Sequence, residues 1–386
     1  MMVGWLRTGF IVIAALALMG YAAARSLSNA VVDQNPGLAA TLAPANGLAQ
    51  DELVRLQVAP LLLKPDSANL GPVMARARAA LQQEPFALSS LAAIAEYERN
   101  QRRPAVANAV LDHAARLSRR DVLVQLELIQ RSSAAGDERG LIRHMDEALR
   151  TNQALYGTLF PVLAQSLKYP RLIDLMAPIA REDPSWYRLF IGEALTIPAA
   201  LPGVRQLMLM APNGSAARDP QLRINLINQL VANNQIGLAR AYFQALHPQM
   251  RGPILDPDFT HPSLEAPFGW LVNEDPDLTA DFVRGEGLTA YAASDREGVV
   301  ARQLVSFPPG TYTIRLDADA ADLSVIYLAM ACHGSNDELP VAANRGKGTF
   351  QFRVPTNCSN QWLELGLRDG DDSRPIEASV RSLTLR

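Results

Sequence analysis

The sequence predicts an α-then-β, multidomain fold: helices first, then a domain of antiparallel strands. Leu and Ala dominate the first two thirds of the 386 residues, which favours helix. After about residue 256, short alternating runs bounded by Gly- and Pro-rich turns replace them, which favours strands. Hydrophobic residues make up 48% and charged residues 19%, a composition typical of globular domains rather than disordered chains.

The first element is an uncharged apolar run from Thr8 to Ala24, between Arg7 and Arg25. It is at the short limit for a membrane-spanning helix and slightly long for the core of a signal peptide. We expect an uncleaved signal anchor, a transmembrane helix, over residues 1–25. A cleaved signal peptide is the alternative, because small residues near the end of the run offer a cleavage pattern. Either way, the rest of the chain crosses a membrane.

Residues 51–255, which follow a polar linker at 26–50, carry an internal repeat. Small and apolar residues at helical spacing superimpose at a step of about 34 residues. Three segments hold the trios Val73, Ala77 and Ala80; Ala107, Leu111 and Ala114; and Leu141, Met145 and Ala148. A later segment carries Ala239 and Phe243 after its turn. The spacing predicts stacked helix pairs, an α-solenoid.

These trios resemble the tetratricopeptide repeat, whose second helix carries a small residue, a larger one and then Ala. Ala239 and Phe243 are the best match, and Pro85 falls where the family has its terminating proline. The step is lost between about Tyr156 and Asn213. The resemblance covers roughly 200 residues and implies a non-enzymatic concave surface that binds a partner protein.

The resemblance also implies which residues line the groove, namely polar positions of the first helix in each pair. Carried over position by position, they are Glu96, Arg99, Gln130, Ser133, Asn225 and Asn228. A face of amides suits an extended peptide held through its backbone. The alternative is that these residues form solvated helix faces. The lysine-rich clamp by which some family members hold a terminal carboxylate is missing, so that ligand is not expected.

Residues 256–386 predict an antiparallel β-sandwich, because strand-like runs and turns alternate at short intervals. This segment resembles the jelly-roll modules that bind carbohydrate. The resemblance implies exposed aromatic platforms for sugar rings, for which the candidates are Trp270, Tyr291, Tyr312 and Trp362. The alternative is that these four aromatic side chains are buried in the core. The alternation of Trp362 with neighbouring leucines leaves open which face of the sheet it occupies.

Cys332 and Cys358 are the only two cysteines in the chain. In an exported domain a cysteine pair is usually a disulfide, whereas in a reducing compartment two cysteines are small buried hydrophobes. We therefore predict a bond between them. Closing a loop of about 26 residues in this way contributes on the order of 3 kcal/mol.

No catalytic motif stands out. The five histidines are scattered without paired-ligand spacing, and GxSxG, Walker and GxGxxG sequences are missing. We expect no enzyme, cofactor or metal site. Two alternatives stay open: a carboxylate pair from Asp256, Asp258, Glu274 and Asp275 acting on a glycan, and calcium rather than a plain turn at Asp369–Asp372.

A formal net charge of −3 gives no reason to expect nucleic acid. Anchor, linker, array and sandwich together resemble membrane-anchored tetratricopeptide proteins of Gram-negative envelopes, some of which accompany exopolysaccharide assembly. The resemblance implies a single-pass inner-membrane protein, mostly in the periplasm, that acts as a scaffold for envelope protein partners and possible polysaccharide. One alternative is a glycan-binding or glycan-active protein working through the sandwich. Another is a sandwich that only caps the helices.

Overall fold

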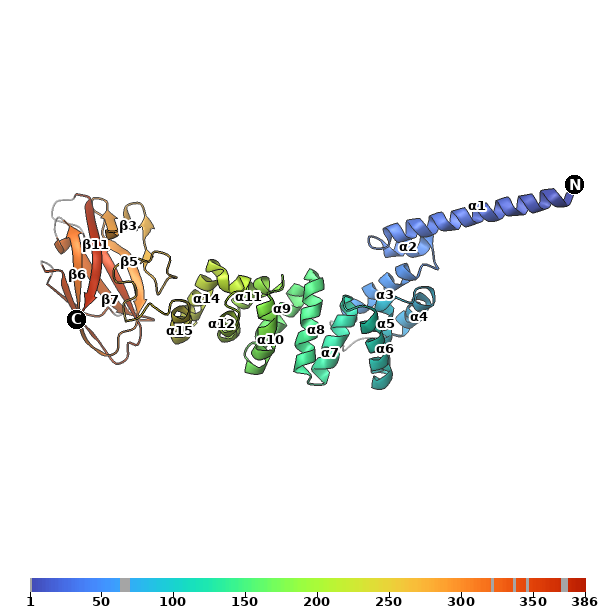
Figure 1. Cartoon of the computed structure of the whole chain (residues 1–386), viewed down its shortest axis with the longest axis horizontal. Coiled ribbons are helices and arrows are strands. Elements are labelled where there is room, and N and C mark those ends of the chain that lie inside the picture. The colour runs from blue at the N-terminus through green and yellow to red at the C-terminus, as the bar shows by residue number, and fades with distance from the viewer. Residues whose placement is uncertain (1, 63–69, 321–322, 336–337, 345–346, 369–373) are drawn as a thin grey trace. The chain divides into compact units, whose positions relative to one another are not determined.

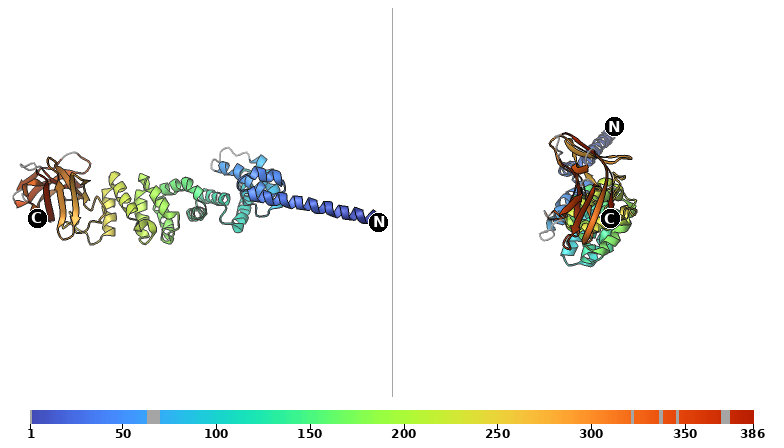
Figure 2. Two further views of the ribbon diagram at one scale, coloured as in Figure 1. Left: turned by 90° about the horizontal axis from the view of Figure 1, so that it is seen from above. Right: turned by 90° about the vertical axis from the view of Figure 1, so that its left-hand side faces the viewer.

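The computed structural model describes residues 2–62, 70–320, 323–335, 338–344, 347–368 and 374–386. For residues 2–11, 61 and 62 it describes the backbone only. Helices come first and antiparallel strands follow, as predicted (Figure 1). The strands gather in one body at the C-terminal end, coloured orange to red in both views of Figure 2.

The chain divides into two compact units. The first comprises Met1–Val162, Asp174–Ile179 and Pro184–Trp186, and the second comprises Leu163–Ile173, Ala180–Asp183 and Tyr187–Arg386. The second unit therefore contains the last helices together with every described strand. Each unit is described by itself below.

The described residues form fifteen α-helices. Their bounds are α1 Met2–Val31, α2 Pro36–Leu42, α3 Gly47–Leu62, α4 Gly71–Gln83, α5 Leu88–Asn100, α6 Pro104–Leu117, α7 Val122–Ala134, α8 Glu138–Thr151, α9 Tyr156–Ser166, α10 Pro170–Glu182, α11 Tyr187–Ala194, α12 Leu201–Met210, α13 Ser215–Arg218, α14 Pro220–Ala232 and α15 Ile236–Leu246.

The helices between α4 and α8 recur at the step that the sequence predicts. The small residues of the predicted trios are buried, which lets successive helices approach closely: Ala77 and Ala80 in α4, Ala107 and Ala114 in α6, and Ala148 in α8. Side chains cap the helix starts. Asp121 accepts a hydrogen bond from the Val124 backbone N–H at 3.0 Å, and Asp137 accepts one from Gly140 at 2.9 Å.

The N-terminal helix corrects the expected location. Among the helices the structure describes, none is both long enough and apolar enough to cross a membrane. The prediction of a single-pass inner-membrane anchor is therefore wrong. Helix α1 runs past Arg25 to Val31 and includes polar residues. The side chains of Thr8–Ile11, the start of the expected span, lie outside the described residues.

Polar contacts explain why α1 continues into the stretch expected to be a linker. Ser28 is fully buried and donates a hydrogen bond to the Ala39 carbonyl at 2.8 Å. The buried Asn46 side-chain amide donates to the Ser28 hydroxyl at 2.7 Å and to the Asn29 side-chain amide oxygen at 2.8 Å. Helix α2 and the start of α3 lie within residues 26–50. The end of α1 is thus fixed by hydrogen bonds to the turn before α3.

The strands form two sheets in which every pair is antiparallel. One has four strands in the order β1-β5-β10-β7, and the other has seven in the order β2-β3-β4-β11-β6-β9-β8. The bounds are β1 Leu271–Val272, β2 Glu274–Asp275, β3 Leu278–Val283, β4 Gly287–Ala292, β5 Gly298–Val305, β6 Gly310–Ala320, β7 Ile326–Cys332, β8 Val341–Asn344, β9 Thr349–Val354, β10 Gln361–Leu367 and β11 Ile376–Leu385.

Both sheets contribute to one hydrophobic core. Alternate residues of β10, such as Leu363 and Leu365, are buried in it together with Ile314 of β6 and Val380 of β11. Because side chains alternate across a strand, the intervening residues of β10 lie on the opposite face of the four-stranded sheet. That face is where the candidate site lies.

Within the second unit, the last helix packs against the segment that leads into the strands. The Phe243 ring of α15 lies 5.5 Å from that of Phe268, and the Arg240 guanidinium lies 5.1 Å over the Phe268 ring. The buried Glu265 carboxylate contacts His247 Nε2 at 2.5 Å. The second unit is thus continuous from helix to sheet, as a capping sandwich would require.

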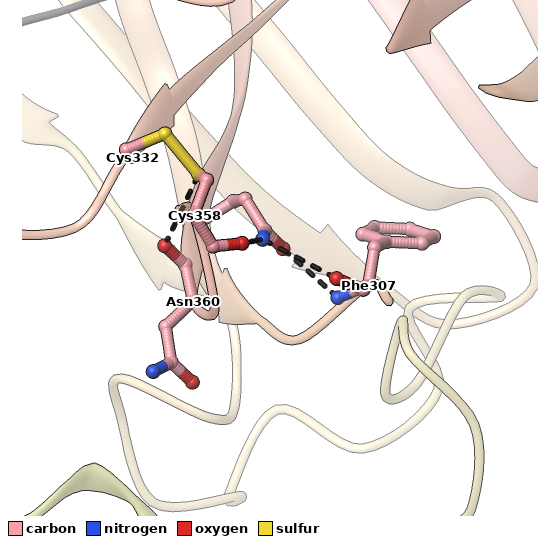
Figure 3. The surroundings of a disulfide bond; sticks show 5 residues. Phe307, Cys332, Cys358 and Asn360 are labelled. Carbon is pink, nitrogen blue, oxygen red and sulfur yellow. Dashed lines mark hydrogen bonds between the residues drawn. A yellow bond between two sulfur atoms is a disulfide. The ribbon is translucent and has the colours of Figure 1, made fainter. Parts of the chain in front are cut away.

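The predicted disulfide is confirmed. Cys332, at the end of β7, is bonded to Cys358, in the loop before β10, at a sequence separation of 26 (Figure 3). Beside it, the fully buried Gln361 side chain accepts a hydrogen bond from the Phe307 N–H at 2.9 Å and donates one to the Cys358 carbonyl. The bond and the amide together hold the start of β10.

Replacing Cys332 and Cys358 by Ser in one double variant should lower the free energy of unfolding of the strand domain by about 3 kcal/mol, because the loop is no longer closed in the unfolded chain. Urea unfolding followed by circular dichroism measures this. Reduced wild-type protein is the matched control and should match the variant. Equal midpoints for oxidised and reduced wild type would contradict the prediction.

Candidate functional site

The outer face of the four-stranded sheet brings together an aromatic ring and several charged groups. Glu364 of β10 lies in register with Arg302 of β5 on one side and Ala329 of β7 on the other. Directly opposed residues of antiparallel strands share a face, and so do residues two apart on one strand. Trp362 therefore lies on the same face as Glu364, while Leu363 between them points into the core.

The Trp362 ring is half-buried, with a cation and a second ring beside it. The Arg302 guanidinium lies over the indole at 4.8 Å from the ring centroid, and Arg302 itself is exposed. The His333 imidazole lies 6.1 Å from the indole, centroid to centroid. A flexible, solvated arginine over an aromatic ring is a contact that a ligand can replace or share.

Tyr327 of β7 adds a second ring to this face, and a glycine makes room for it. Gly366 of β10 is in register with Tyr327, and a Cβ at Gly366 would lie 2.2 Å from the Tyr327 ring. The ring thus lies flat across β10. The Arg368 guanidinium lies 5.0 Å from the centroid of the same ring. Burial, and then the charge of Glu364, raises the pKa of Tyr327, so it is a neutral hydroxyl at pH 7.

Several polar groups on this face have no hydrogen-bond partner among the described residues. The half-buried Glu364 carboxylate accepts no hydrogen bond there, and the buried Nε of Arg368 has no partner. Burial raises the pKa of Glu364, the nearby Glu338 adds to this, and Arg302 opposes it. Partial burial of an ionised carboxylate costs stability, and carboxylates whose pKa is raised in this way cluster at functional sites.

Two shallow pockets flank Glu364. One, of about 350 Å³, lies on the β1 side and is lined by Leu271 and Arg302 among others. The other, of about 500 Å³, lies on the β7 side and is lined by Tyr327 and Arg368 among others. Both include Glu364, so its carboxylate borders each. The volumes fall in the range of small-ligand sites, about 300–1,000 Å³.

The arrangement offers flat apolar rings, guanidinium donors and a carboxylate acceptor side by side. A ligand with alternating apolar and hydroxyl surfaces matches all three, because its C–H faces can stack on rings while its hydroxyls bond to charged groups. The same groups could also pair with a ligand carboxylate through Arg302 or Arg368.

The structure separates the four predicted platform residues. Only Trp362 lies on this face. Trp270 is buried, packs on Phe259 at 5.0 Å and donates to the Asp256 carbonyl at 3.0 Å. The half-buried Tyr312 packs on Phe307 and Phe352, and its hydroxyl donates to the Pro308 carbonyl. Tyr291 is half-buried on the outer face of the seven-stranded sheet, since its neighbours on β4 point inward.

The predicted groove residues of the first unit are partly engaged within the protein. The Arg99 guanidinium of α5 donates to the buried carboxylates of Glu96 and of Glu127, which lies on α7, and to the Gln130 amide oxygen at 3.2 Å. This network links α5 to α7. Ser133 is exposed on α7.

The predicted groove residues of the second unit lie on α14. Asn225 is half-buried and its amide oxygen accepts a hydrogen bond from Gln221 at 2.9 Å, while Asn228 is exposed. Asn225 and Asn228 belong to the second unit, whereas the other four predicted groove residues belong to the first.

Two of the four carboxylates considered for glycan chemistry, Asp256 and Asp275, have structural partners. The buried Asp256 side chain accepts hydrogen bonds from the backbone N–H groups of Thr260 and His261, both at 2.9 Å, and Asp275 forms an ion pair with Arg296 at 2.9 Å. Within the described part of the chain, no group of three or more His, Cys, Asp or Glu side chains could hold a metal ion. Asp369–Asp372 lies outside the described residues.

The sequence analysis missed Arg302, Glu364, Tyr327 and Arg368. Arg302, Glu364 and Tyr327 come from three strands, and Arg368 directly follows β10; the neighbourhood of these strands depends on non-local pairing, so no local pattern groups the set. One local signal was available. A glycine inside a strand often marks the close approach of another group, and Gly366 is such a position.

The sequence matches no known protein-family model, and no curated protein matches it. The ligand class must therefore be argued from the chemistry of the face itself. The decisive features are the half-buried Trp362 ring, the Glu364 carboxylate, which accepts no hydrogen bond from a described residue, and the arginines beside them.

Replacing Glu364 by Gln should raise the melting temperature at pH 7.5 and have no effect near pH 4. The folded-state pKa is raised above the ordinary value near 4.5, so the ionised form costs stability above the folded pKa. That cost declines as pH falls through the folded pKa and is absent below the unfolded value. Thermal unfolding at several pH values measures this. The exposed Glu377→Gln is the control, and a gain independent of pH would refute the interpretation.

Replacing Arg99 by Ala should lower the free energy of unfolding by about 3 kcal/mol, because the buried Glu127 carboxylate then has no counter-charge. Urea unfolding of the full chain measures the loss. Ser133→Ala, at another predicted groove position, should be neutral. If Arg99→Ala were equally neutral, Arg99 would be a solvated groove residue as first expected.

Proposed function

We propose that this protein is a non-enzymatic glycan-binding protein whose sugar site is the outer face of the four-stranded sheet. The observation that carries the proposal is the Glu364 carboxylate, half-buried without a hydrogen-bond partner among the described residues and set between Trp362 and the Tyr327 ring. Such a group is satisfied once a ligand donates hydroxyl hydrogens to it.

In this proposal a sugar ring stacks on Trp362 and shares that ring with Arg302. The apolar C–H face of the sugar buries surface against the indole. The Arg302 guanidinium then lies beside the sugar and donates to a hydroxyl or carboxylate of the sugar ring. Glu364 accepts from the next hydroxyl. Tyr327 and Arg368 extend the face by one further position along the sheet. Four groups from three strands, and Arg368 directly after β10, then contact one extended glycan.

The resemblance of the sequence to jelly-roll carbohydrate-binding modules supports the same ligand class. We propose that the two sheets with their shared core are such a jelly roll, and that the helix pairs are tetratricopeptide-like. The rigid support of the face also favours binding. Its strands are fixed by the core, and the start of β10 is held by the Cys332–Cys358 bond. Sites on rigid elements lose little entropy when a ligand binds.

A scaffold for a partner protein is the second candidate function. Helix pairs that recur at a regular step leave one surface of an array free, and such arrays generally bind other proteins. Among the predicted groove residues, Ser133 and Asn228 are exposed and available to a partner. The two functions are compatible, because the helices and the sheet face use different residues.

Titrating the full chain with a soluble polyuronate and with a neutral dextran in a calorimeter should give saturable heat for at least one of them. Trp362→Ala should weaken that binding by about tenfold or more, because the stacking surface is removed. Arg302→Ala should weaken the polyuronate more than the dextran, since its guanidinium is the partner for a carboxylate.

Tyr291→Ala is the matched control, because it removes a half-buried aromatic ring from the outer face of the opposite sheet. It should leave glycan affinity unchanged. Absence of heat with both polysaccharides, from folded protein, would remove the glycan proposal. An equal loss for Trp362→Ala and Tyr291→Ala would place the site elsewhere.

A further inference from the structure

The first unit contains a pocket of about 430 Å³ lined by α6, α7, α8 and the turn between α6 and α7. It is separate from the predicted groove residues, none of which lines it. Its ionisable lining is Arg116, Arg119, Arg131, Arg143, His144 and Glu147. The volume is larger than a single small anion needs and lies in the range of ligand sites, about 300–1,000 Å³.

The pocket is strongly basic in a chain of formal net charge −3. Four guanidinium groups face one carboxylate, Glu147. Arg131 donates to Asp112 at 2.6 Å and is already paired. The exposed side chains of Arg116 and Arg119 have no hydrogen bond or ion pair with any described residue. The positive charge of the lining is therefore mostly uncompensated, which favours an anionic ligand.

A series of hydrogen bonds connects the polar side chains in the buried part of the pocket. The buried Gln125 amide donates to the Arg119 carbonyl at 2.8 Å, and its oxygen lies 3.2 Å from His144 Nδ1. His144 Nε2 lies 3.2 Å from Arg143 Nη2. Because a guanidinium can only donate, Nε2 is the acceptor and Nδ1 carries the hydrogen. Burial, and then the charge of Arg143, lowers the pKa of His144, in keeping with this neutral tautomer.

These hydrogen bonds connect Arg143 on α8 to the turn between α6 and α7, which carries Arg119. Arg143 is held through His144 and Gln125 to the Arg119 backbone. The segments that carry Arg119 and Arg143 are therefore already fixed before a ligand binds. Binding does not have to include the entropy cost of ordering these segments. Leu128 adds an apolar surface beside these groups.

From this geometry we infer that the pocket binds an acidic peptide segment of a partner protein, with its carboxylates paired to Arg116, Arg119 and Arg143. Guanidinium forks match carboxylates bidentately. The lining comes from three successive helices, which spreads the arginines and suits a chain with several carboxylates better than a single ion. Leu128 can pack against the apolar atoms of such a chain. The inference does not depend on the glycan proposal, whose residues all lie in the second unit.

The test measures fluorescence anisotropy of a labelled short polyglutamate peptide titrated with the full chain, beside a polyglutamine peptide of equal length. Only the glutamate peptide should bind, and more weakly as salt rises. The double variant Arg116→Gln/Arg119→Gln should lower its affinity by about tenfold or more. Both side chains are exposed and unpaired among the described residues, so the variant should keep the stability of the wild type.

The matched control is Arg76→Gln/Arg78→Gln, which removes the same charge from α4. It should leave affinity unchanged. An equal loss in both double variants would mean attraction by overall charge, and would overturn the site. Displacement of the peptide by inorganic phosphate at equal concentration would show a small-anion site instead. No binding of polyglutamate at low salt would also overturn the inference, whatever the calorimetry with polysaccharides shows.

Discussion

The candidate glycan face depends on the burial of alternate residues of β10 in the core shared by the two sheets. Leu363 and Leu365 are each about 1% exposed, and their burial fixes the parity of the strand. A slip of one residue would exchange the two faces and expose these leucines, each worth roughly 2 kcal/mol of burial. Trp362 and Glu364 are therefore held outward by the same interaction that stabilises the domain, and the neighbouring strands supply Arg302 and Tyr327 in register.

Two sets of carboxylates contrast in this protein: Glu96 and Glu127 in the first unit, and Glu364 in the second. In the first, Glu127 and Glu96 are matched by Arg99, so the network stabilises the packing of α5 against α7. In the second, Glu364 has a charged neighbour but no hydrogen bond among the described residues, and its pKa is raised. Natural proteins retain destabilising polar groups mainly at functional sites, where ligand binding compensates for the lost stability. This difference favours function at Glu364 and structure at Glu96 and Arg99, the reverse of what the repeat resemblance implies.

The order of helices and strands and the Cys332–Cys358 bond could be predicted, because periodicity and cysteine number are local or compositional signals. The surroundings of Trp362 could not, since strand order β1-β5-β10-β7 joins residues far apart in the sequence. At the N-terminus, hydropathy alone favours an anchor that ends near Arg25. The buried pair of Ser28 and Asn46 explains why the helix extends further, and neither residue is conspicuous in the sequence.

The two proposed ligand surfaces differ in rigidity, because one lies on a β-sheet and the other is formed by arginine side chains on helices and one turn. On the sheet face, rings and a carboxylate lie in a plane set by strand register, which suits a flat ligand of many hydroxyl groups. In the helical pocket, Gln125 and His144 fix the bases of long, flexible arginines around a volume of about 430 Å³. Flexible arginine side chains can adapt to the backbone of a peptide. Salt weakens their attraction to the peptide carboxylates. The two proposed surfaces use different residues in different units, so we expect their two proposed ligands not to compete.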